Sequence, residues 1–176
     1  QEFSEQLNRQ AYEASVRLAG LCGEPEVLEG YGRRNTTLLA IAPTTSSSFI
    51  LGAVSPSTEP LVSNYYQKKL AKGTFVYRNP YLQEVLETYK KNTKAVWESI
   101  RDNWGSVQHL DFLTDNERAV FLTWSELPQE AIIRQAAIRA PYIDQAQSTN
   151  LMLPASTPAK ELHRLHVLAW ESGLKT

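Results

Sequence analysis

The sequence predicts an α/β fold that is rich in helices and contains one β-hairpin. Residues 37–42 (TLLAIA) form a short apolar run ahead of a predicted helix, and residues 150–153 (NLML) form a second run ahead of another helix. Strand–helix units of this kind favour parallel strands. A Lys72-Gly73 turn between stretches rich in Tyr, Phe and Val predicts an antiparallel hairpin over residues 64–79. Two parallel strands cannot close a sheet alone, so the chain forms either a mixed α/β domain with the hairpin or part of a larger barrel.

The chain opens with a predicted amphipathic helix over residues 2–20, which Gly20 would end. A loop with three glycines and a proline follows over residues 23–34 and leads into the first strand. Apolar residues recur at helical spacing along the helix, so we expect them to form its buried face. They are Phe3, Leu7, Tyr12, Val16 and Ala19.

The turn after the first strand has the features of an anion-binding site. Pro43, Thr44 and Thr45 interrupt the strand, and Ser46, Ser47 and Ser48 open the helix that follows, which Gly52 would end. The first backbone N–H groups of a helix have no intrahelical partner, and the helix dipole favours negative charge there. The glycines of a P-loop are absent, so this is not a Walker site. Ser and Thr also act simply as helix caps, and the pattern alone leaves that alternative open. The candidate residues are Thr44, Thr45, Ser46, Ser47 and Ser48.

Local signals define the helices that follow the hairpin. A proline fits the first turn of a helix over residues 80–89, and the next helix covers residues 92–104. Thr114, with Glu117 three residues later, has the capping-box pattern for a helix over residues 115–126.

Two more helices complete the chain. One covers residues 128–140 and stops before a proline, and a polar connection over residues 142–148 leads to the second short strand. We expect Thr157 to cap the last helix in a capping box with Glu161. The predicted buried stripe of this helix contains Leu162, Leu165, Ala169 and Trp170.

Composition narrows the class of protein. The 176 residues are 42% hydrophobic and 21% charged, and the formal net charge is −1. This balance gives no electrostatic reason to expect a nucleic-acid or membrane partner. The single cysteine excludes an internal disulfide and favours a cytoplasmic location. No apolar run approaches the roughly 20 residues of a membrane span, and the polar N-terminus is not a signal peptide.

Other residues invite a catalytic interpretation, but their contexts do not support one. Cys22 is more simply a buried, unreactive thiol at a helix end. The pair Tyr65-Tyr66 lies in the predicted hairpin, where we expect it to pack as part of a strand. His163 and His166 are three residues apart on a helix without an apparent third ligand, so no metal site is predicted.

Four long segments of the sequence carry a family resemblance. They are RNTTLLAIAPTTSSSFILG (34–52), STEPLVSNYYQKKLAKGTFVYRNPYL (57–82), APYIDQAQSTNLML (140–153) and HRLHVLAWESGLKT (163–176). In this order they resemble the large (alpha) subunit of class I ribonucleoside-diphosphate reductases. The first is similar to that family's phosphate-binding segment, and the last two are similar to its IDQSQS-N stretch and its helix ending in W-x-x-GLKT. The resemblance implies that the fold is a helix-rich part of the family's ten-stranded α/β barrel.

The resemblance also implies a function for the hydroxyl turn. Residues 44–48 would bind the diphosphate of the substrate. The intact enzyme reduces the 2′-hydroxyl of ribonucleoside diphosphates by radical chemistry and so supplies deoxyribonucleotides for DNA replication. In the family a thiyl radical forms in an Asn-x-Cys-x-Glu context, two further cysteines supply electrons, and a tyrosine pair relays the radical. None of these elements can be placed in this sequence. We therefore assign no catalytic residue, no metal and no cofactor to this segment.

The implied partners are those of a reductase subunit. They are a ribonucleoside diphosphate, the rest of the large subunit, a small (beta) subunit that generates the radical, and thiol reductants. The intact large subunit is expected to be a homodimer. We expect residues 1–176 to form a single segment of the barrel domain, incomplete at both ends and inactive alone. The alternative is a non-catalytic, stand-alone remnant that binds phosphate or a protein partner.

Overall fold

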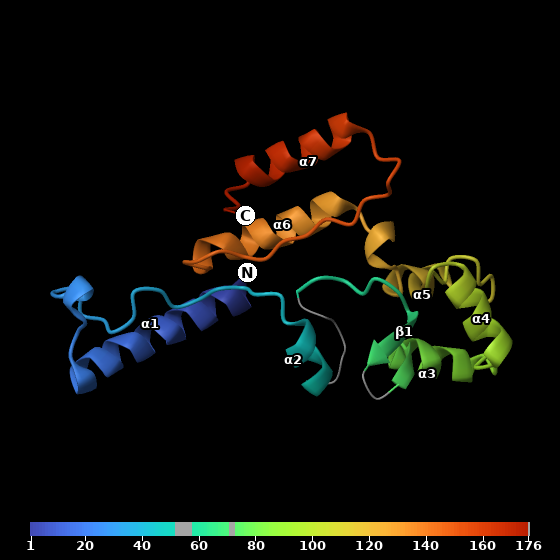
Figure 1. Cartoon of the computed structure of the whole chain (residues 1–176), viewed down its shortest axis with the longest axis horizontal. Coiled ribbons are helices and arrows are strands. Elements are labelled where there is room, and N and C mark those ends of the chain that lie inside the picture. The colour runs from blue at the N-terminus through green and yellow to red at the C-terminus, as the bar shows by residue number, and fades with distance from the viewer. Residues whose placement is uncertain (52–57, 71–72, 176) are drawn as a thin grey trace. The chain divides into compact units, whose positions relative to one another are not determined.

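The computed structural model describes residues 1–51, 58–70 and 73–175 (Figure 1). The chain divides into two compact units, which are described separately below. Unit 1 consists of Gln1–Pro43 together with Gln129–Thr176, and unit 2 consists of Thr44–Pro128. Because unit 1 is discontinuous in sequence, its contacts join residues as far apart as Leu38 and Asp144, which are separated by 106 positions.

Unit 1 contains three α-helices and two short 3-10 helices. The N-terminal part of the unit contains one α-helix and one 3-10 helix, and the C-terminal part contains two α-helices and one 3-10 helix. Helix α6 packs against both η3 and α7. The elements are α1 (Glu2–Cys22), η1 (Glu26–Leu28), α6 (Gln129–Arg139), η3 (Ala140–Tyr142) and α7 (Ala159–Glu171).

Polar residues, and not the predicted apolar face, hold helix α1 to its unit. The buried hydroxyl of Ser15 accepts hydrogen bonds from the backbone N–H groups of Arg34, at 3.1 Å, and Asn35, at 2.8 Å. The helix continues past Gly20 to Cys22, and Gly23 follows it with φ of +76°. The predicted burial is wrong because the predicted residues do not share one side of the helix: at about 100° per residue, Phe3 and Leu7 lie opposite Tyr12 and Val16. These side chains are exposed by 77% at Phe3, 42% at Leu7, 45% at Tyr12 and 40% at Val16.

Helices α6 and α7 pack through a narrow apolar contact and one charged cluster. Leu165 of α7 is 1% exposed, as predicted, and Ile133 of α6 is equally buried. The guanidinium of Arg164 binds the carboxylates of both Glu161 and Glu130, so it links the two helices. The remainder of the predicted stripe is not buried, since Leu162 is 43% exposed and Trp170 is 76% exposed.

The predicted cap of α7 is also corrected. Its N-cap residue is Pro158 and no side chain caps it. Glu161 lies four positions after Thr157, whereas a capping box needs three, so the predicted reciprocal pair cannot form.

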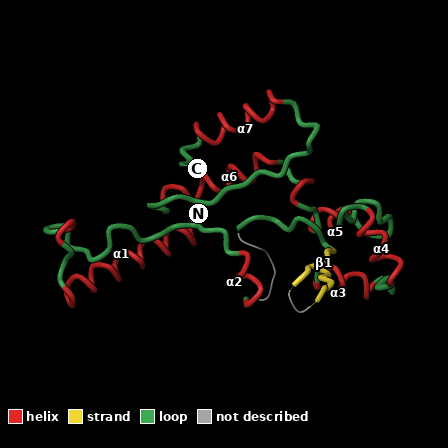
Figure 2. The backbone as a smooth tube through the Cα atoms, in the orientation of Figure 1, coloured by secondary structure: helices red, strands yellow, loops and turns green. Residues whose placement is uncertain are grey.

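Neither of the two predicted parallel strands is a regular strand. The run at residues 37–42 is extended and makes one isolated parallel bridge, between Ile41 and Gln147. The run at residues 150–153 has no strand pairing in the part of the chain that the structure describes. Both appear as loops in Figure 2. A strand requires a backbone neighbour along its length, and within unit 1 the first run has only the short stretch around Gln147 beside it.

Unit 2 is built from a hairpin and several short helices. The hairpin was predicted, and it forms an antiparallel two-stranded sheet, shown in yellow in Figure 2. Lys72 of the predicted turn lies outside the described residues. The elements are α2 (Thr45–Ile50), β1 (Tyr65–Leu70), β2 (Gly73–Arg78), α3 (Pro80–Thr88), α4 (Lys94–Asp102), α5 (Asp115–Val120) and the 3-10 helix η2 (Trp124–Glu126).

Aromatic residues connect the hairpin to the core of unit 2. Tyr66 stacks on Tyr77 across the strands, with ring centroids 4.6 Å apart, and Tyr65 lies 6.1 Å from the ring of the buried Trp97. This confirms that the tyrosine pair packs as part of a strand. The core cluster consists of Leu82, Leu86, Trp97, Ile100, Val107, Leu110, Leu113 and Phe121.

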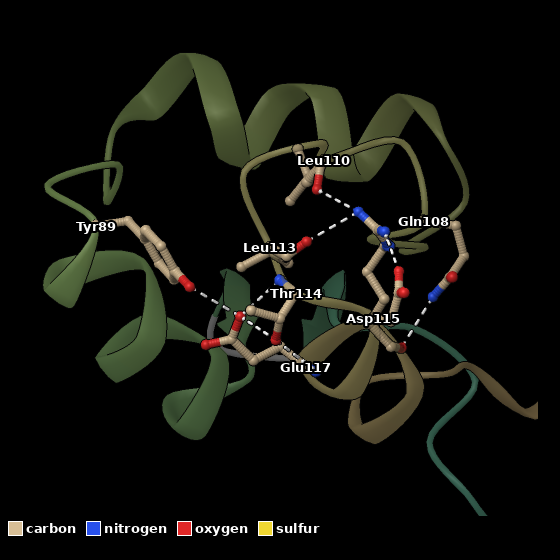
Figure 3. Close-up of polar contacts among 8 residues, drawn as sticks. Tyr89, Gln108, Leu110, Leu113, Thr114, Asp115 and Glu117 are labelled. Atoms are coloured by element: carbon tan, nitrogen blue, oxygen red, sulfur yellow. Dashed lines mark hydrogen bonds and ion pairs between the residues drawn. The ribbon is translucent and has the colours of Figure 1, made fainter.

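Side-chain caps fix the helices of unit 2. The predicted capping box is confirmed: the Thr114 hydroxyl accepts from the N–H of Glu117, and the Glu117 carboxylate accepts from the N–H of Thr114 at 2.8 Å (Figure 3). The hydroxyl of Tyr89 donates to the same carboxylate at 3.0 Å. The N–H and hydroxyl of Thr114, followed by the Tyr89 hydroxyl, hold the pKa of Glu117 below its usual value. At α3 the buried Asn79 caps the first turn.

The single helix predicted over residues 115–126 is interrupted. Helix α5 ends at Val120, and Thr123 then opens η2 with a capping box of its own, in which its N–H donates to Glu126 at 2.7 Å. This second box competes with helix continuation, because a capping threonine adopts an extended backbone, here with ψ of 162°.

Candidate functional site

The hydroxyl turn lies at the N-terminus of a helix, as predicted. Thr44 is the N-cap of α2, with φ of −106° and ψ of 31°, and its side chain makes no capping bond. The N–H of Ser48 donates to the carbonyl of Thr44 at 2.9 Å, which closes the first helical turn. Thr44 and Ser47 are exposed. The side chains of Thr45 and Ser46, and the predicted helix stop at Gly52, lie outside what the structure describes.

A helix start of this kind carries backbone donors that can bind an anion. The backbone N–H groups of a first helical turn have no intrahelical partner, and they point along the dipole toward negative charge. Here the cap hydroxyl of Thr44 does not occupy them. Phosphate oxygens are suited to such a position.

One carboxylate, that of Asp144, accepts hydrogen bonds from the backbone of the segment that leads into this turn. Asp144 accepts the N–H of Leu38 on Oδ2 at 2.6 Å and the N–H of Leu39 on Oδ1 at 2.8 Å. Partial desolvation raises the pKa of Asp144, but backbone N–H groups, those of Leu39 and Leu38 first and then those of Asp144 and Gln145, together outweigh that effect, and the pKa is lowered overall. The carboxylate is therefore ionised and takes the place of a neighbouring strand for two consecutive backbone donors.

Backbone bonds continue this pairing toward the hydroxyl turn. The N–H of Gln145 donates to the carbonyl of Leu39 at 3.1 Å, and the N–H of Ile41 donates to the carbonyl of Ala146 at 3.1 Å. The N–H of Ser148 then donates to the carbonyl of Ile41 at 2.7 Å. The lead-in, Leu38–Ile41, thus runs parallel to residues 144–148 and ends three residues before Thr44.

Two further residues hold residues 144–148 in place. The ammonium of Lys175 donates to the carbonyls of Asp144 at 2.8 Å and Gln145 at 2.9 Å. The buried Gln147 donates through Nε2 to the carbonyl of Ala136 at 2.8 Å and accepts from Nε of Arg139 at 3.1 Å. The lead-in is therefore connected through side chains to α6 and to the segment after α7.

The sequence pattern alone does not single out Asp144, Gln147 or Lys175. They lie in two segments that carried the family resemblance, but the first was interpreted only as a polar connection. Asp144 and Gln147 both lie in a short polar stretch that runs into an apolar run, and this was the available signal. The backbone partners of the Asp144 carboxylate lie 105 and 106 positions away, which no local pattern reveals.

The other candidates considered from the sequence lie in ordinary structural positions. Cys22 is exposed at the end of α1, so the expectation of a buried thiol is wrong. Its carbonyl accepts from the guanidinium of Arg34 at 3.1 Å. The Nδ1 atom of His166 contacts the carbonyl of Leu162 at 2.8 Å, within α7.

Metal ligation and membrane insertion were also assessed over the described residues. No group of three or more His, Cys, Asp or Glu side chains there could hold a metal ion. No helix in that part of the chain combines the length and apolarity needed to cross a membrane.

Comparison with known proteins identifies the family. Residues 24–176 match the family model described as ribonucleotide reductase, barrel domain. The chain belongs to this family. The match confirms the resemblance found in the sequence, and it confirms a fold that is a helix-rich part of the reductase barrel with an antiparallel hairpin.

Individual relatives agree with the family assignment. The chain is 45% identical over 163 residues to the ribonucleoside-diphosphate reductase large subunit of Invertebrate iridescent virus 6, covering 90% of this chain and 17% of that protein. It is 42% identical over 165 residues to the putative large subunit of Frog virus 3, covering 94% of this chain and 29% of that protein.

A solved structure gives the same result. The alpha subunit of the class Id ribonucleotide reductase from Actinobacillus ureae is 52% identical, with a TM-score of 0.89 over 98% of this chain and 31% of that chain. The chain therefore spans less than a third of the length of the reductase subunits compared here.

Proposed function

We propose that this chain is a segment of a ribonucleoside-diphosphate reductase large subunit and that it carries the loop that binds the substrate diphosphate. The observation that supports this most directly is the run Thr44–Ser48 at the start of α2, in a chain that belongs to the reductase barrel family. The uncapped helix start supplies backbone donors and dipole, and the hydroxyls add further donors for phosphate oxygens.

The chemistry of the reaction belongs to the assembled enzyme. In that assembly the ribonucleoside diphosphate loses its 2′-hydroxyl by radical chemistry, in the cytoplasm. The radical comes from a small (beta) subunit, thiol reductants supply the electrons, and the remainder of the large subunit completes the barrel. The complete large subunit acts as a homodimer. Within this division of roles, residues 44–48 hold the diphosphate and orient the ribose toward the reacting groups.

Exposed apolar side chains support an assembly in preference to a stand-alone remnant. Leu21 is 82% exposed, Phe3 is 77% exposed and Trp170 is 76% exposed, all within unit 1. Phe3, Leu7, Leu18 and Leu21 lie on one side of α1, at spacings that recur with the helical period. Exposed apolar side chains gathered on one side of a helix are typical of a surface that contacts another polypeptide.

Diphosphate binding can be tested on the chain itself by ¹H–¹⁵N NMR. Titration with cytidine diphosphate is expected to shift the backbone amides of residues 44–48, and cytidine at the same concentration is expected to leave them in place. Thr44→Val and Ser47→Ala should each weaken the response, because each removes one exposed hydroxyl. Thr74→Val is the matched control, since Thr74 is an exposed threonine of β2. Equal responses to cytidine and cytidine diphosphate would contradict the proposal.

The enzymatic part requires a reconstitution. The chain alone is expected to show no reduction of cytidine diphosphate. Turnover should appear when the remaining large-subunit polypeptide, a small subunit carrying its radical and a dithiol are all supplied. Absence of turnover with this complete set, in a mixture shown to associate, would count against the split-reductase assignment. A monodisperse, cooperatively melting chain that binds diphosphate but never associates would instead favour the remnant.

A further inference from the structure

The start of the lead-in to the diphosphate loop is held by a side chain, and the rest of it by backbone bonds to residues 145–148. A buried strand normally has backbone neighbours along its length. Here two consecutive donors, the N–H groups of Leu38 and Leu39, bind the two oxygens of the Asp144 carboxylate instead. Hydrogen bonds to an ionised carboxylate are stronger than those to a neutral carbonyl. The start of the lead-in is therefore anchored at one side chain.

The backbone of Asp144 is in turn bound by the ammonium of Lys175. The ammonium of Lys175 binds the carbonyls of Asp144 and Gln145, at 2.8 and 2.9 Å, and its positive charge lies on the peptide that carries the carboxylate. The carbonyl of Ile143 is a third neutral acceptor for Lys175, at 3.5 Å, and α7 ends only four positions before this lysine. It thus connects the end of the chain's last helix to the residue that grips the lead-in.

The far end of the same stretch is attached to α6. Gln147 is buried, and its amide bonds to the Ala136 carbonyl and to Arg139 fix the backbone that bridges to Ile41. Between Asp144 and Gln147 the lead-in therefore has two fixed points. Ala42 and Pro43 then connect it to Thr44, and the proline ring restricts the backbone at that connection.

We propose that Asp144 and Lys175 are positioning residues for the diphosphate loop, acting through the backbone of Leu38 and Leu39. This inference rests on the proposed function, because it concerns the same loop. Neither side chain needs to touch the substrate. Their role is to fix the point from which Thr44–Ser48 depart, so that the donors of the loop are ordered before the diphosphate binds. Pre-ordering a binding segment increases affinity because less conformational freedom is lost on binding.

The test compares charge-preserving and charge-removing variants of the full chain. The variants are Asp144→Asn, Lys175→Met and Lys175→Arg, and the probe is cytidine diphosphate followed by ¹H–¹⁵N NMR. Asp144→Asn and Lys175→Met are expected to weaken binding by about tenfold, which is within the usual range for coupling between separate positions. Both should also accelerate amide hydrogen exchange at Leu38 and Leu39. Lys175→Arg should restore binding to within about twofold, because it keeps the cation.

A control variant and a second readout separate positioning from general stability. Lys94→Met removes an exposed lysine of α4 that pairs only with Glu98 among its described contacts, and it should change neither readout. Unchanged affinity in both Asp144→Asn and Lys175→Met, with faster exchange at Leu38 and Leu39, would overturn the positioning role and leave the proposed function intact. A parent chain that does not bind cytidine diphosphate would instead refute the diphosphate loop, and with it this inference. Should Asp144→Asn fail to fold, the comparison of Lys175→Met with Lys175→Arg decides the question.

Discussion

The two units of this chain use apolar residues in different ways. Unit 2 buries a cluster around Trp97 and Leu86, whose exposed fractions are 1% and 0%, within one continuous stretch of sequence. Unit 1 is discontinuous, and its longest helix exposes apolar side chains that the sequence pattern would bury. The difference shows that apolar residues in a helix predict a contact surface. They do not show whether the residues that cover this surface belong to the same chain.

The largest expected effect lies in the unit 2 core. Trp97→Ala should reduce the free energy of unfolding of unit 2 by about 3–5 kcal/mol, because it removes a buried aromatic and leaves a cavity. Trp104→Ala is the matched control: Trp104 is 90% exposed, so a change within about 0.5 kcal/mol is expected. Urea unfolding monitored by hairpin NMR signals measures both. Comparable losses in the two variants would contradict the description of unit 2 as a self-contained core.

A second comparison uses two glycines with similar backbone angles. Gly105 in unit 2 has φ of +85°, and an added Cβ would lie 1.9 Å from Oγ and 2.7 Å from Cα of Ser63. Gly105→Ala should destabilise unit 2 by about 1–3 kcal/mol through overpacking, in addition to backbone strain. Gly23→Ala in unit 1, with φ of +76° and nothing within 4 Å, should show only the strain, about 1–2 kcal/mol. Thermal melts of the two variants measure the difference in stability. A larger loss of stability in Gly23→Ala than in Gly105→Ala would contradict the overpacking expected at Gly105.

A third comparison uses two threonines that precede helices, one in each unit, and the expected difference in stability is about 1 kcal/mol. Thr114→Ala removes the capping box of α5 and should lower stability by about 0.5–2 kcal/mol. Thr157→Ala precedes α7 without capping it, so the expected change is within about 0.5 kcal/mol. Chemical denaturation followed separately in each unit is the measurement. A loss of stability in Thr157→Ala as large as that in Thr114→Ala would show that Thr157 caps α7, as the sequence pattern suggested.

The smallest effect on stability is expected on the exposed face of α1. Leu21→Glu replaces a side chain that is 82% exposed, so the free energy of unfolding of the chain should change by no more than about 0.5 kcal/mol. In the reconstituted reductase the same change should prevent association with the remaining polypeptide, as followed by analytical ultracentrifugation. Glu13→Gln, an exposed polar substitution on α1, serves as the control and should leave association intact. Normal association of Leu21→Glu would show that this face has another role.

Local signals predicted much of this fold. The helix start at Pro80, the capping box at Thr114 and the hairpin between Tyr65 and Arg78 each depend on residues within a few positions of one another. The hydroxyl turn at Thr44–Ser48 was likewise placed correctly at a helix N-terminus, and its ligand stays a prediction. In each case the residues that decide the structure are neighbours in sequence.

The features that the sequence did not predict depend on distant partners. The run at residues 37–42 is apolar enough for a strand, but its main neighbour is the Asp144 carboxylate, more than a hundred positions away. Helix α1 was predicted to bury apolar side chains, yet what its unit buries is the hydroxyl of Ser15. The sequence around Asp144 and around Ser15 contains no local pattern from which their partners can be predicted.

The discontinuity of unit 1 also sets an order of events during folding. The bonds from Leu38 and Leu39 to Asp144 close a loop that contains the whole of unit 2. Loop closure costs entropy that rises with the number of free residues enclosed, whereas the contacts of unit 2 are closed within its own sequence. Once unit 2 has folded, fewer residues in the intervening stretch are free, and closure becomes easier. We therefore expect the bonds between Asp144 and the lead-in to form late, after unit 2 has folded.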